Sequence, residues 1–139
     1  MEINNFNDLL EFARRESEPQ RLLLVFIGAT LPENASAEQI AAFHAGKGGE
    51  LEPVMYVDKD PHEILSFEAL TAESADYGPP WSLVFTSSVS WRDGRAPTSE
   101  ETEASLHHMI ECIRAGLFEG MLPFDRDGEP VHLVSVSTT

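Results

Sequence analysis

The first half of the chain alternates between segments with helical spacing of apolar residues and segments that are apolar throughout. Helical spacing covers residues 5–16, and it returns after Ser36, which forms a capping box with Gln39, as far as Gly46. Residues 22–27 are apolar on both faces, which predicts a central strand covered by helices on each side. A compact apolar run at residues 54–57 predicts a second strand.

The second half begins with a strong helix-start signal, in which Asp60 is a cap, Pro61 lies in the first turn and Glu63 is the acidic partner. It predicts a third helix that ends before Gly78. A third strand is predicted at residues 81–85, followed by a long loop from 86 to 98, where periodicity is lost. A capping box of Thr98 with Glu101 predicts a fourth helix that ends at Gly116. Residues 121–124 and 130–136 predict a hairpin around a turn at 125–128.

This order of elements predicts a single α/β domain spanning residues 1–139. We expect a mainly parallel sheet of about five strands, with right-handed crossovers, helices on both faces and a C-terminal antiparallel hairpin. A chain of 139 residues is long enough to bury one hydrophobic core.

Charge narrows the possible partners. Nine basic residues against 24 acidic ones give a formal net charge of −15, which repels phosphate backbones and anionic lipid. We therefore expect no nucleic-acid and no membrane partner, and the absence of an apolar leader predicts a cytoplasmic protein. A basic protein or a metal cation stays compatible with this charge, although high net charge also simply keeps proteins soluble.

A candidate ligand site follows from the predicted parallel sheet, because ligands bind beyond the carboxyl ends of parallel strands. Ala29 and Thr30 follow the first strand there. The candidate ligand residues are those after the second and third strands and on the adjoining loop: Asp58, Lys59, Ser87, Ser88, Arg92 and Arg95. Their positive charges favour a small anion. Exposed ion pairs with neighbouring carboxylates are the alternative interpretation.

Other catalytic patterns are incomplete. Neither Ser87 nor Ser88 lies in a G-x-S-x-G elbow, so the sequence predicts no serine nucleophile. His107 with Glu111 and His108 with Cys112 have helical i, i+4 spacing, but the two pairs point in different directions and neither closes a metal site. We therefore predict no catalytic residue, no metal and no cofactor.

Four segments resemble a family of small uncharacterised proteobacterial proteins: PQRLLLVFIGATLP, PVMYVDKDPHEILSF, WSLVFTSSVSWRDGRAPTSEE and LPFDRDGEPVHL. The resemblance spans nearly the whole chain and implies no activity or site residues. Members of the family often carry the label "ribonucleotide reductase subunit alpha". That reaction uses several cysteines, whereas this chain has only Cys112, so we do not expect a ribonucleotide reductase.

Two functions remain after these exclusions. The first is a non-catalytic interaction or accessory protein, with an unknown protein partner or self-association through an apolar edge such as the terminal hairpin. The second is a binding protein or enzyme that holds a small anionic ligand at the predicted strand ends.

Overall fold

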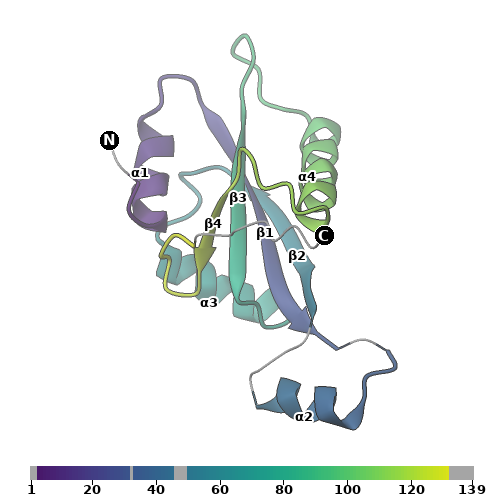
Figure 1. Ribbon diagram of the computed structural model, residues 1–139. Coiled ribbons are helices and arrows are strands. Elements are labelled where there is room, and N and C mark those ends of the chain that lie inside the picture. Colours follow the sequence, from purple (N-terminus) through teal and green to yellow (C-terminus); the bar gives the residue numbers. More distant parts are fainter. Residues whose placement is uncertain (1–2, 32, 46–49, 132–139) are drawn as a thin grey trace.

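The computed structural model describes residues 3–31, 33–45 and 50–131, and its strands form one antiparallel sheet (Figure 1). The order across the sheet is β2 (Glu50–Lys59), β1 (Gln20–Thr30), β3 (Leu83–Ser90) and β4 (Leu122–Asp125). Helices α1 (Phe6–Arg15) and α3 (Phe67–Tyr77) pack on one face, and α4 (Ser99–Arg114) packs on the other. Helix α2 (Ala37–His44) stands beyond the ends of β1 and β2.

The predicted parallel sheet is wrong. Every neighbouring pair of strands is antiparallel, and the described residues contribute four strands to the sheet. β2 and β3 do run in the same direction, but β1 lies between them in the opposite direction. The apolar residues of β1 indicate that both faces of the strand are covered by helices, and they indicate nothing about the direction of its neighbours. A covered central strand looks the same in either kind of sheet, so burial gave no information on strand direction.

Two apolar layers hold the helices to the sheet. On one face the side chains of β1 that include Leu24 and Phe26 pack with Phe6 and Leu10 of α1 and with Phe67 of α3. On the other face the alternate side chains of β1 pack with α4, in a cluster of Leu23, Val25, Ile27, Phe85, Leu106 and Met109. The predicted burial of β1 on both faces is therefore confirmed, and α1 and α4 lie on opposite faces of the same sheet.

The third helix begins later than predicted. Asp60 to Glu63 form a single turn, in which the Asp60 amide donates to Glu63 Oε1 at 3.0 Å, and α3 starts at Phe67 after the cap Ser66. The guanidinium of Arg14 on α1 donates to the carbonyl oxygens of Pro61 and Ile64. Arg14 therefore ties this turn to α1 and satisfies carbonyl groups that lie outside the hydrogen-bond ladder of α3.

The predicted loop at residues 86–98 is also partly wrong, because β3 continues to Ser90 and pairs with β1 as far as Gln20. A tight turn follows, in which the Arg92 amide donates to the Arg95 carbonyl at 3.0 Å and the Arg95 amide donates back at 2.9 Å. Asp93 and Gly94 both have positive φ angles, 51° and 75°, as a two-residue hairpin turn requires. An Asp-Gly pair is typical of such turns, and it is the sequence signal that could have indicated this one.

The C-terminal hairpin is confirmed as far as the structure describes it. The Gly128 amide donates to the Asp125 carbonyl at 3.1 Å across the turn, and Phe124 bridges Pro130. The Phe6 amide of α1 donates to the Gly128 carbonyl at 2.9 Å, which ties this turn to α1. Residues 132–136 of the predicted hairpin lie outside the described residues. No helix among the described residues is long and apolar enough to span a bilayer.

Candidate functional site

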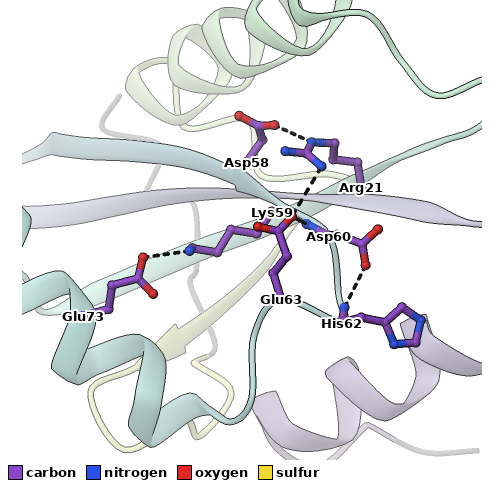
Figure 2. Close-up of polar contacts among 7 residues, drawn as sticks. All are labelled: Arg21, Asp58, Lys59, Asp60, His62, Glu63 and Glu73. Atoms are coloured by element: carbon purple, nitrogen blue, oxygen red, sulfur yellow. Dashed lines mark hydrogen bonds and ion pairs between the residues drawn. The ribbon is translucent and has the colours of Figure 1, made fainter.

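The predicted ligand residues of β2 point to opposite faces of the sheet (Figure 2). Asp58 lies on the α4 face and accepts a hydrogen bond from Nε of Arg21. Lys59 lies on the α3 face, where its Nζ is 2.7 Å from Oε1 of Glu73 and its side chain is only 14% exposed. Glu63 adds a second carboxylate 3.7 Å from Arg21. Both predicted ligand residues are thus already ion-paired, each with a different partner.

The remaining predicted residues are spread along β3 and its turn. Ser87 lies in the same row as Asp58, and Ser88 in the same row as Lys59, with one residue of β1 between each pair. Arg92 and Arg95 face each other across the turn that follows β3. Ala29 and Thr30 lie at the other end of the sheet, because β1 runs against both of its neighbours. Antiparallel pairing therefore separates Ala29 and Thr30 from the other predicted residues, which lie at one end of the sheet but on both of its faces.

Positive charge at the turn is balanced by carboxylates. A cavity of about 360 Å³ is lined by Arg92 and Arg95, but also by Asp93 and Glu101. The Thr98 amide donates to the Glu101 carboxylate and holds the pKa of this group below its ordinary value, and the two arginines contribute further in the same direction. Glu101 is therefore ionised at neutral pH, so this cavity has as many carboxylates as guanidinium groups.

A different feature emerges along the outer side of β3. β4 pairs with β3 only from Leu83 to Thr86, and Gly120 lies against Ser87, whose Oγ is 3.4 Å from the Gly120 carbonyl. Among the described residues, none pairs with the outer side of Ser88, Val89 and Ser90. We call these three residues the open edge.

The direction of the backbone groups at the open edge follows from the ladder with β1. The Trp91 amide donates to the Pro19 carbonyl at 3.0 Å, so Trp91 faces β1. Backbone groups of a strand point alternately to its two sides. Ser87 and Val89 therefore face β1, while the N–H and C=O groups of Ser88 and Ser90 point outward, away from the sheet.

A cavity lies beside the open edge on each face of the sheet. The α1-side cavity has a volume of about 340 Å³, and the α4-side cavity has a volume of about 450 Å³. Both are lined by Ser87, Ser88 and Gly120. The α1-side cavity adds mainly apolar side chains: Ile3, Leu9, Phe12, Ala13, Leu22 and Leu122. Space is therefore available on both faces of an unpaired strand segment.

The α4-side cavity also contains the lone cysteine. Sγ of Cys112 is 3.5 Å from Nε2 of His108, one helical turn away. His107 instead contacts Glu103, with 3.3 Å between Nε2 and Oε1. Within the part of the chain that the structure describes, no three histidine, cysteine or carboxylate side chains gather as a metal site would require.

Sequence reasoning selected Ser87 and Ser88 because they follow the predicted third strand, whereas in the structure both lie within β3 and the backbone of Ser88 points outward. It missed Phe12 and Leu122, because their role depends on how α1 and β4 meet β3. Comparison of the chain with protein-family models gives no match, and comparisons with curated proteins and with solved structures give none either.

Proposed function

We propose that this protein is a non-catalytic interaction protein that binds an extended, basic segment of a partner protein as an additional strand along the open edge. The observation that carries the proposal is the outer side of residues 88–90, which pairs with none of the residues that the structure describes and has a cavity beside it on each face of the sheet. Strand addition of this kind takes its affinity from main-chain hydrogen bonds and its specificity from pockets for alternate side chains.

The chemistry of the edge supports this use. Residues 88–90 contain no charge and no proline, and these are the features by which edge strands usually avoid pairing with other chains. Ser88 and Ser90 offer two N–H donors and two C=O acceptors to an incoming strand. Each hydrogen bond contributes about 0.5–1.5 kcal/mol, so additional side-chain contacts are needed for a stable complex.

Charge selects the kind of partner. Glu16 lines the α1-side cavity, Glu119 lines the α4-side cavity, and the whole chain carries a net charge of −15. A segment added between the two cavities would have a carboxylate on each side. A basic segment is attracted by this field and an acidic one is repelled, which favours a basic partner and speeds its association.

The test is a selection from a phage-displayed library of short random peptides against the full-length protein. We expect basic peptides whose affinity falls about tenfold in Ser88→Pro, because proline removes an outward donor and obstructs the neighbouring bonds. Ser88→Ala keeps the backbone and should keep the affinity. In amide NMR spectra of the wild type, the signals of Ser88 and Ser90 should shift when a selected peptide is added.

Two results would overturn the proposal. One is a set of peptides that bind Ser88→Pro as well as the wild type, which would place binding elsewhere. The other is a dimer in analytical ultracentrifugation that Ser88→Pro dissociates, because this would assign the open edge to a second copy of the chain.

A further inference from the structure

We infer, on the basis of the proposed function, that the bound segment inserts a large apolar side chain into the α1-side cavity and places a basic side chain in the α4-side cavity, against Glu119. Side chains of an added strand point alternately to the two faces of the sheet. Neighbouring residues of the segment would therefore enter different cavities, and the difference between the cavities would set the sequence that is bound.

Helix α1 carries an apolar surface that is wider than its fully buried stripe. Phe6, Leu10 and Ala13 are buried in the core, and they lie within about 60° of one another around the helix axis. Leu9 and Phe12 extend the apolar surface to about 120° from Phe6, on one side only. Both line the α1-side cavity. Leu9 also packs against the core, so Phe12, which is 40% exposed, is the α1 side chain that leaves apolar surface open toward this cavity.

The sheet contributes apolar lining to the α1-side cavity as well. Leu122, at the start of β4, is 44% exposed, and Phe12 of α1 is 40% exposed. The lining also includes Leu22 of β1, which is buried. An apolar side chain placed here would cover both exposed residues, and burial of such surface contributes about 25 cal/mol per Å². The α1-side cavity therefore favours a large aliphatic or aromatic residue.

The α4-side cavity has a different rim. Its lining includes the buried Leu23 and Met109, while Glu119 and His108 are exposed. Lysine and arginine side chains place their aliphatic stems along apolar surface and keep the charged group at the rim. A carboxylate at the rim then pairs with that group. This cavity therefore favours a basic residue next to the apolar one in the bound segment.

The peptides selected on the wild type provide the test. They should share an apolar residue adjacent to a basic one, and Phe12→Ala and Leu122→Ala should each weaken their binding about tenfold. Glu119→Gln should weaken binding severalfold and reduce its dependence on salt. Leu65→Ala is the matched control, because Leu65 is 81% exposed and lines neither cavity. Thermal unfolding of each variant checks that the fold is intact.

The outcomes separate this inference from the proposed function. If Ser88→Pro abolishes binding while Phe12→Ala, Leu122→Ala and Glu119→Gln leave it unchanged, strand addition stands and the cavity assignment fails. If Ser88→Pro also leaves binding unchanged, both fail. Selected peptides that lack the adjacent apolar and basic residues would overturn the cavity assignment by themselves.

Discussion

The two outer strands of the sheet present different edges. β2 contains Pro53, which cannot donate a backbone hydrogen bond, and its pairing with β1 is interrupted by a register shift opposite Phe26 and Ile27. It also carries charges at Glu52, Asp58 and Lys59. The open edge of β3 has none of these features. Residues 88–90 are serine, valine and serine, in a chain in which 24% of the residues are charged.

The two edges of this sheet therefore differ in how well they are protected from pairing with another strand. Prolines, bulges and charges stop a further strand from pairing at β2. At the other side, β4 covers only half of β3, and α1 and α4 flank the uncovered half on the two faces. Protection of one edge but not the other agrees with the proposal that a partner strand adds at the open edge. The comparison can be tested at individual backbone and side-chain positions.

Proline substitutions at neighbouring positions of β3 should give the largest contrast in stability. Ser87→Pro removes a donor that faces β1 and leaves a carbonyl of the buried central strand unpaired, so we expect a loss of about 2–4 kcal/mol. Ser88→Pro affects an outward donor and should cost about 1 kcal/mol or less. Urea unfolding of both variants measures the contrast. Equal losses would mean that the outward direction of the Ser88 backbone is wrong.

Local sequence patterns predicted some elements of the fold, but they did not predict features that depend on strand pairing. Helix α4 was predicted correctly from its capping box of Thr98 with Glu101, because capping depends on a few adjacent residues. The helix-start signal at residues 60–63 was less accurate, since it forms a separate turn and α3 begins only at Phe67. Strand direction and the length of β3 were not predicted correctly. Ser87, Ser88 and Ser90 carry no apolar alternation, and only pairing with β1 makes this segment a strand.

The candidate site was less predictable than the fold. Lys59 and Asp58 are adjacent in sequence and were expected to act together, but alternate residues of a strand face opposite sides. Their partners, Glu73 and Arg21, come from a helix and a strand that are distant in sequence. The cavities beside the open edge likewise arise where α1, α4 and β4 meet β3, and no local pattern encodes such a meeting point.

We call the edge formed by β2 (residues 50–59) the closed edge. The ion pair between Asp58 of β2 and Arg21 of β1 should stabilise the fold without affecting binding. Arg21 and Asp58 are each about one-third exposed, at 32% and 31%, so we expect a coupling energy of about 0.5–1 kcal/mol in a double-mutant cycle of Arg21→Ala and Asp58→Ala. The more exposed pair of Arg15 and Glu11, 4.0 Å apart, is the matched control and should give a smaller coupling. Urea unfolding at low and high salt measures both. Loss of peptide binding in Asp58→Ala would contradict the assignment of binding to the opposite edge.

The smallest effect concerns the contact between the closed edge and α4. The Tyr56 hydroxyl on β2 donates to Oε1 of Glu103 on α4 at 3.1 Å, and this bond, together with the carboxylate charge, raises the pKa of Tyr56 above its ordinary value of 10.0. Because the folded-state pKa is raised, the contribution of this contact to stability is fully present below pH 10.0 and is lost as the pH rises through the folded-state pKa.

Glu103→Gln should therefore lower the pKa of Tyr56 toward its ordinary value, because the carboxylate charge is removed while the side chain keeps its shape. The measurement is an ultraviolet titration of the phenolate, in a Tyr77→Phe background so that Tyr56 is the remaining tyrosine. A pKa of Tyr56 that is the same with and without Glu103→Gln would contradict the contact. Peptide affinity should not change in Glu103→Gln, since Tyr56 and Glu103 line neither cavity beside the open edge. A change in affinity would instead show that the two edges are coupled through α4.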